Sequence, residues 1–91
     1  MIWNKFPKAT TSWTSIVDRD DENFRYDITI TGVPINDPMK GDRLVFLAVI
    51  YTVALDTESP TIVNVQQMGP MDTETDLMMY VEEQYNRGIL K

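Results

Sequence analysis

The chain contains no cysteine and no histidine among its 91 residues. The lack of cysteine excludes disulfide bonds, cysteine-ligated zinc sites and thiol nucleophiles, and it suits a reducing compartment such as the cytoplasm. The lack of histidine removes the commonest general base of enzymes. We therefore expect a cytoplasmic protein that is not an enzyme, with no catalytic residues, no bound metal and no cofactor.

Neither the glycines nor the densest acidic cluster outlines a site for a phosphate or a metal ion. The four glycines are too far apart in the sequence to cradle a phosphate. The cluster from Asp18 to Glu22 departs from a calcium-binding loop, because Asn23 and Thr29 stand where that loop needs a glycine and a bidentate glutamate. A solvated turn is the simpler interpretation.

Apolar segments of membrane-spanning length are also missing. The longest apolar run, from Leu44 to Leu55, is too short to cross a bilayer as a helix, and the N-terminus has no apolar stretch of signal-peptide length. A hydrophobic content of 43% is enough for one modest core. We expect a single soluble domain spanning residues 1–91.

Positive charge is absent from almost half of the chain. Residues 44 to 86 hold seven acidic side chains and no lysine or arginine, within a net charge of −6. Because phosphate backbones and anionic membranes bind cationic surfaces, we expect no direct nucleic-acid partner and no membrane partner. The charge favours a protein partner with a basic surface.

The apolar patterns indicate an antiparallel sheet. Residues 24–31 alternate between apolar and polar side chains, as a half-buried strand does, and residues 44–55 are apolar on both alternation sets, which favours a central strand over a buried helix. A third strand is predicted at 61–67. Two prolines and two glycines within residues 32–42 predict a long connection. The economical arrangement is a three-stranded meander, to which the N-terminal segment can add a fourth strand.

A helix is predicted from about Thr73 to Arg87. Gly69-Pro70 is expected to end the preceding strand, Asp72 or Thr73 can cap the helix, and Gly88 suits its C-terminal end. One apolar stripe is formed by Leu77, Met78, Val81 and Tyr85. The predicted fold class is α+β, a small antiparallel sheet with a C-terminal helix packed on one face.

The first 23 residues fit a helix, a strand or an arm. Trp13, Ile16 and Val17 have helical spacing, whereas Trp13, Ser15 and Val17 fit a strand. The central strand, apolar on both faces, also needs a cover on the face that the helix leaves free. The N-terminal segment can supply that cover, or a second copy of the chain can, through a homodimer at the open sheet face.

Two large side chains of the predicted helix, Met79 and Tyr80, lie off its apolar stripe. Such residues among carboxylates are typical of a recognition surface, although single exposed apolar residues are also common. The candidate partner-binding residues are Asp76, Met79, Tyr80, Glu82 and Glu83 on the helix, with Asp56 and Glu58 in the turn after the central strand.

Three functions are compatible with these features. The first is an acidic module that binds another macromolecule through the helix and, in one form, inhibits it. The second is a DNA mimic that blocks a nucleic-acid-binding protein, as short, acidic phage and mobile-element proteins do. This analogy depends on size and composition and on no shared motif. The third is a minor structural or assembly component of a larger particle.

Overall fold

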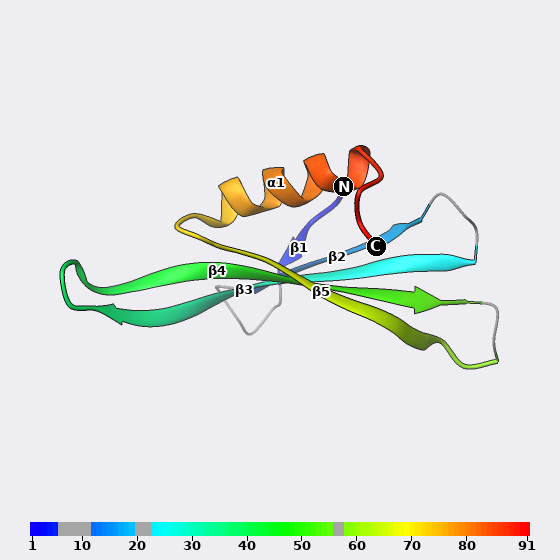
Figure 1. Cartoon of the computed structure of the whole chain (residues 1–91), viewed down its shortest axis with the longest axis horizontal. Helices are drawn as coiled ribbons and strands as arrows, with labels where there is room; N and C mark the ends of the chain where they lie inside the picture. The colour runs from blue at the N-terminus through cyan, green and yellow to red at the C-terminus, as the bar shows by residue number, and fades with distance from the viewer. Residues whose placement is uncertain (6–11, 20–22, 56–57) are drawn as a thin grey trace.

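The computed structural model describes residues 1–5, 12–19, 23–55 and 58–91, which form one antiparallel sheet and one helix (Figure 1). The elements are β1 (Asn4–Lys5), β2 (Ser12–Asp18), β3 (Phe24–Asp37), β4 (Gly41–Ala54), β5 (Thr61–Met71) and α1 (Glu74–Asn86). The strands lie side by side in chain order, each antiparallel to the next. The predicted α+β class is confirmed, and the sheet has five strands where three or four were predicted.

One face of the sheet and one side of α1 enclose the core. Along β3 and β4 every second side chain points toward the helix, and the apolar stripe of α1 contributes Leu77 and Val81, both fully buried. Met78 and Tyr85, the other predicted stripe residues, pack partly buried against the same core. The buried cluster consists of Tyr26, Ile28, Ile30, Ala48, Ile50, Leu77, Val81 and Leu90.

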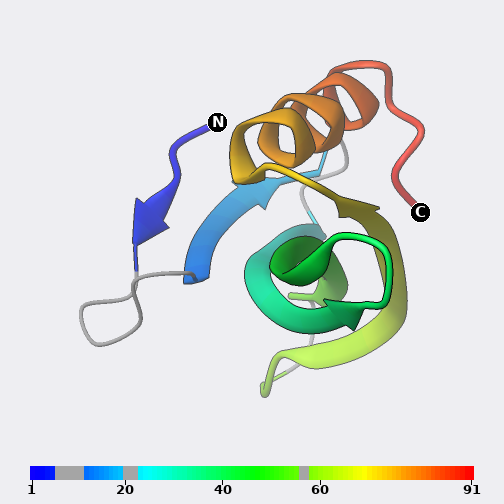
Figure 2. The ribbon, with the colours of Figure 1, turned by 90° about the vertical axis from the view of Figure 1, so that its left-hand side faces the viewer.

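The predicted long connection at residues 32–42 is wrong, because β3 and β4 continue through it as a paired hairpin up to Asp37 and Gly41. Pro34 is tolerated there because β2 ends its pairing at Thr31, so that within the described residues this part of β3 pairs with β4 alone. The hairpin extends beyond the end of α1 in Figure 1. Seen from that end, the sheet is strongly coiled, with β2 and β5 on opposite sides of the hairpin (Figure 2).

The prediction that Gly69-Pro70 ends a strand is also wrong, since β5 continues to Met71. A register shift opposite Phe46 and Ala48 accommodates the two residues. Gly69 has a φ of +101°, and a Cβ placed there would lie 2.9 Å from the carbonyl oxygen of Phe46. Glycine is therefore required both by the backbone conformation and by the close approach of β4.

The ends of α1 are formed as predicted. The backbone N–H of Asp76 donates to Oγ1 of Thr73 over 3.2 Å, which makes Thr73 the N-cap. At the other end Gly88 has a φ of +69°, and the N–H of Ile89 donates to the carbonyl of Gln84. These bonds satisfy backbone groups that the helix itself leaves unpaired.

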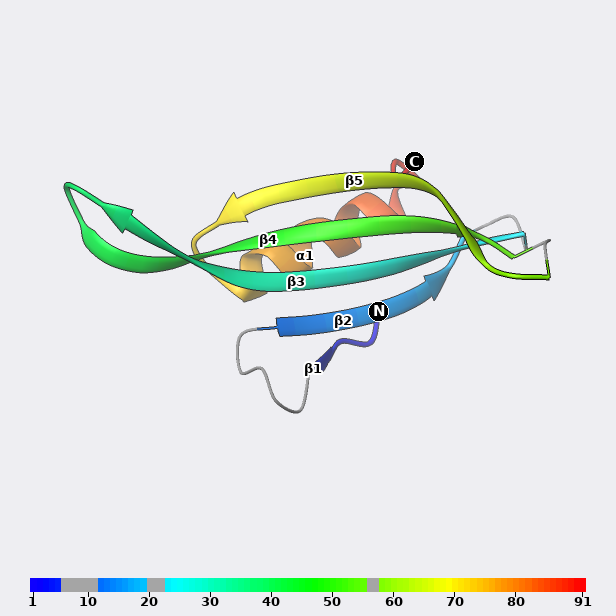
Figure 3. The same ribbon diagram turned by 90° about the horizontal axis from the view of Figure 1, so that it is seen from below.

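The N-terminal residues add strands to the sheet. Residues 12–18 form β2, which settles the choice between helix and strand, and β1 is a two-residue edge strand. Trp3 and Trp13 pack on the same side as α1. In the part of the chain that the structure describes, no N-terminal residue covers the opposite face, which is open in Figure 3. Among the described residues, no helix has the length and apolar character needed to cross a bilayer.

Candidate functional site

The outward side of α1 carries a shallow surface hollow of about 730 Å³, here called the α1 hollow. It is lined by Met71, Asp76, Met79, Tyr80, Glu82, Glu83, Asn86 and Arg87. Five of the seven candidate residues, namely all of those on the helix, therefore border one concave surface. The helix repeat explains this, because residues three, four and seven positions apart share one side of an α-helix.

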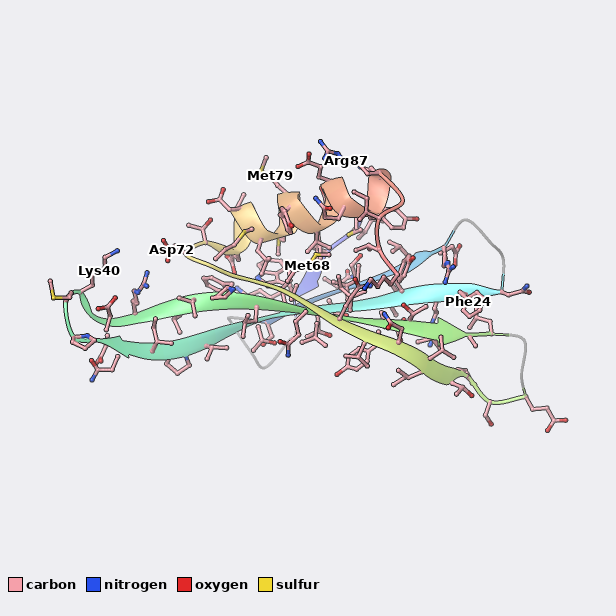
Figure 4. All side chains as sticks on the ribbon, in the orientation of Figure 1. Phe24, Lys40, Met68, Asp72, Met79 and Arg87 are labelled. Carbon is pink, nitrogen blue, oxygen red and sulfur yellow. The ribbon has the colours of Figure 1, made fainter. Side chains whose placement is uncertain are left out.

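Met79 and Tyr80 supply the most exposed apolar surface of the hollow, next to Met71. Met79 is 63% exposed and Tyr80 is 40% exposed, in contrast to the fully buried Leu77 and Val81 on the other side of the helix. Figure 4 shows Met79 and Arg87 projecting away from the sheet, whereas Met68 points into the space beneath the helix. A flexible thioether and an amphipathic ring at the surface can adapt to an apolar side chain of a partner.

The charge of the lining is negative. Three carboxylates, those of Asp76, Glu82 and Glu83, face one guanidinium, that of Arg87, which leaves a formal charge of −2. Arg87 Nη2 lies 2.6 Å from Oε1 of Glu83 in an exposed i,i+4 pair. Because such exposed pairs are weak, a basic group of a partner can compete with Arg87 for Glu83.

Glu82 is held by a residue from the opposite end of the chain. The indole Nε1 of Trp3 donates a hydrogen bond of 2.8 Å to Oε1 of Glu82. In the same way Nε1 of Trp13 donates to Oε2 of Glu74 over 2.7 Å. These charge-assisted bonds tie β1 and β2 to the flank of α1. They also fix the position of the Glu82 carboxylate at one rim of the hollow.

Asp76 differs from Glu82 and Glu83 in that no described residue binds its side-chain carboxylate. Its backbone N–H is used by the helix cap, but within the described residues its exposed carboxylate has neither an ion pair nor a hydrogen-bond donor. It lies in the first turn, where the helix dipole favours a negative charge. The carboxylate is thus free to bind a cation without breaking an existing contact.

Of the two remaining candidates, the structure describes only Glu58, which is not among the residues that line the hollow. Glu58 is exposed and precedes the first residue of β5 by three positions. Asp56 lies outside the described residues. The structure therefore joins the helical candidates to one another and places Glu58 elsewhere.

Sequence reasoning missed three residues that border the hollow, Met71, Asn86 and Arg87, and the anchoring role of Trp3. Asn86 and Arg87 could have been found by extending the helical repeat of Met79 and Glu83 by one turn. Met71 and Trp3 had no such signal, because both reach α1 through tertiary contacts. Among the described residues, no three acidic side chains are grouped as a metal ion would need.

Comparison of the chain with protein-family models, with curated proteins and with solved structures finds no match. The interpretation of the α1 hollow therefore depends on its own geometry and charge. Those properties are suited to binding: an accessible apolar centre, a negative rim and the Asp76 carboxylate, which has no partner among the described residues.

Proposed function

We propose that this protein is a binding module that takes up a short basic and apolar segment of another protein in the α1 hollow. The observation that carries the proposal is the placement of exposed Met79 and Tyr80 between the carboxylates of Asp76, Glu82 and Glu83 on one concave surface. Apolar contact with Met79 and Tyr80 would supply buried area, and the carboxylates would orient a lysine or arginine.

The distribution of charge supports a short segment as the partner. The acidic residues of the hollow lie within two turns of one helix, and Glu58 is not among the residues of its lining. A DNA mimic would need a long array of acids, since B-DNA presents one charge per about 1.7 Å of its axis. The hollow suits a basic peptide better than a nucleic-acid-binding groove. By occupying a basic surface, the module would also inhibit any partner that needs that surface.

The test is a binding titration with isotopically labelled protein followed by NMR. A panel of peptides that place one or two arginines beside a leucine or phenylalanine is added at low salt. The expected result is a set of shifts concentrated at Asp76, Met79, Tyr80 and Glu83, with affinity that falls as salt is added. Shifts spread over the sheet, or none for any peptide, would count against the proposal.

A matched pair of variants separates the hollow from general acidity. Asp76→Asn and Glu58→Gln each remove one exposed carboxylate, but only Asp76 borders the hollow. Asp76→Asn should weaken peptide binding several-fold, while Glu58→Gln should leave it close to wild type. Equal effects of the two variants would indicate attraction by net charge and would contradict a specific site.

A further inference from the structure

The outer edge of β5 combines three properties that point to a second binding surface. β5 is the last strand of the sheet, and among the described residues it pairs only with β4. The main-chain N–H and C=O groups along its outer side are therefore available to another strand. From Asn64 to Met68 the strand pairs with β4 without a register shift, so this stretch presents a regular edge.

The second property is the absence of charge. Thr61 to Met71 contains no acidic or basic residue, although the chain as a whole carries −6. Natural proteins usually protect a free edge with lysine, other charges or proline. Residues 61–67, with the sequence TIVNVQQ, have none of these and are rich in β-branched residues, the composition of segments that pair readily. The one irregularity of this stretch is the register shift at Val63, which lies outside the regular edge from Asn64 to Met68.

The third property is exposed apolar surface on β5 itself. Ile62, Val63 and Val65 are 56%, 53% and 54% exposed. Val65 lies opposite Tyr51, and Ile62 lies opposite Val53, on the face of the sheet turned away from the buried Ile50 and α1. Figure 3 shows this face without a covering element. Apolar area of this kind favours association.

We propose that a second copy of this chain pairs with the β5 edge, antiparallel, strand β5 against strand β5. Antiparallel pairing of a strand with its own copy is closed by a two-fold axis, so it needs no other partner and does not extend into a fibre. The two-fold axis would be perpendicular to the sheet and lie between the two β5 strands. The dimer would then contain one continuous sheet, with five strands from each copy.

The charge of the chain favours a second copy over a different partner. A basic protein would be drawn to carboxylates, and β5 offers it none. Two identical chains of net charge −6 repel each other over acidic surfaces, and a neutral strand is where they can approach with the least repulsion. The same arrangement would place both α1 helices on one side and join the two open faces on the other.

The first experiment measures the molar mass of the full chain by sedimentation across a concentration series. Twice the monomer mass is expected for the wild type. Val65→Lys places two ammonium groups near the two-fold axis and should raise the dissociation constant about tenfold or more. Val65→Thr keeps a neutral β-branched side chain and should remain dimeric. A wild type that stays monomeric at all concentrations would overturn the proposal.

The control is Ile16→Lys, which makes the same kind of change on β2. Ile16 is 64% exposed and lies on the same open face, opposite Asp27, but far from the β5 edge across the strand order. It should leave the dimer unchanged. If Ile16→Lys dissociates the dimer as much as Val65→Lys does, the copies stack face to face and edge pairing is wrong.

A cysteine scan supports the test even if Val65→Lys fails to fold. The chain has no cysteine, so each single substitution between 62 and 67 introduces the only thiol. In an antiparallel pair of identical strands, only the residues at the two-fold axis lie opposite the same residue of the other copy. Disulfide formation should therefore peak at one or two neighbouring positions of β5. It should be low for the control Ile16→Cys. An even yield along β5 would contradict the pairing. Asp76→Asn should not affect this readout, which keeps it separate from peptide binding.

Discussion

Trp3 and Glu82 are 79 positions apart in the chain, and the indole N–H of one donates to the carboxylate of the other over 2.8 Å. This bond connects the edge strand β1 to the rim of the α1 hollow. Trp13 and Glu74 repeat the arrangement at the first turn of the same helix. The two tryptophans thus align the N-terminal strands with α1 through both packing and polar contacts.

Trp3→Phe should lower the free energy of unfolding by about 1–2 kcal/mol, because it removes a partly buried hydrogen bond to a charged group and little apolar area. Urea denaturation followed by circular dichroism measures the change. Glu82→Gln, which keeps an acceptor oxygen, should cost less than Trp3→Phe. If Trp3→Phe is as stable as the wild type, the bond contributes nothing to the fold.

Leu77→Ala and Met79→Ala should differ sharply, although the two positions are two residues apart on one helix. Leu77 is fully buried, and its truncation should destabilise the protein by about 2–5 kcal/mol. Met79 is 63% exposed, and its replacement should change stability by no more than about 0.5 kcal/mol. Thermal unfolding of both variants measures the difference. A large loss of stability in Met79→Ala would show that the Met79 side chain is packed against other residues and does not line an open hollow.

Gly69→Ala should be more harmful than Gly41→Ala. Both glycines have positive φ, but a Cβ at Gly41 meets nothing within 4 Å, whereas at Gly69 it meets the Phe46 carbonyl oxygen at 2.9 Å. We expect losses of about 1 kcal/mol at Gly41 and about 3 kcal/mol at Gly69. Denaturant midpoints measure the stability of both variants. Equal losses of stability would mean that the backbone around residue 69 shifts to make room for the new Cβ.

Thr73→Ala should destabilise the protein by about 1 kcal/mol, because the N–H of Asp76 loses its side-chain acceptor at the start of α1. Thr73→Ser retains the hydroxyl and should stay within a few tenths of a kcal/mol of the wild type. Amide hydrogen exchange in the first turn gives a local measure. Unchanged protection in Thr73→Ala would show that the cap is dispensable.

Arg87→Gln should cost little stability, about 0.5 kcal/mol or less, since its pair with Glu83 is exposed. It should also tighten the binding of a basic peptide by about two- to fivefold, because the lining loses its one guanidinium and Glu83 becomes available. Calorimetric titration measures the affinity. Weaker binding in Arg87→Gln would contradict an acidic site.

Local sequence patterns were reliable where a contact is made within one element. Residue type limited the cap to Asp72 or Thr73, of which the structure has Thr73. The Glu83–Arg87 pair and the exposure of Met79 and Tyr80 follow from helical spacing. Proline and glycine were misleading at residues 32–42 and at Gly69-Pro70, because their effect depends on which side of the strand has a neighbour. Pro34 lies beyond the last residue that pairs with β2, a fact that no local pattern contains.

The sequence by itself determined the α+β class, the buried stripe of α1 and the acidic helix face, because periodicity and charge are properties of neighbouring positions. Only the tertiary structure decided that the N-terminal strands join the sheet edge, that Trp3 reaches Glu82, and that Met71 completes the hollow. These contacts depend on how strands pair and coil over long sequence separations. For the same reason the bare β5 edge could be recognised only once the strand order was known.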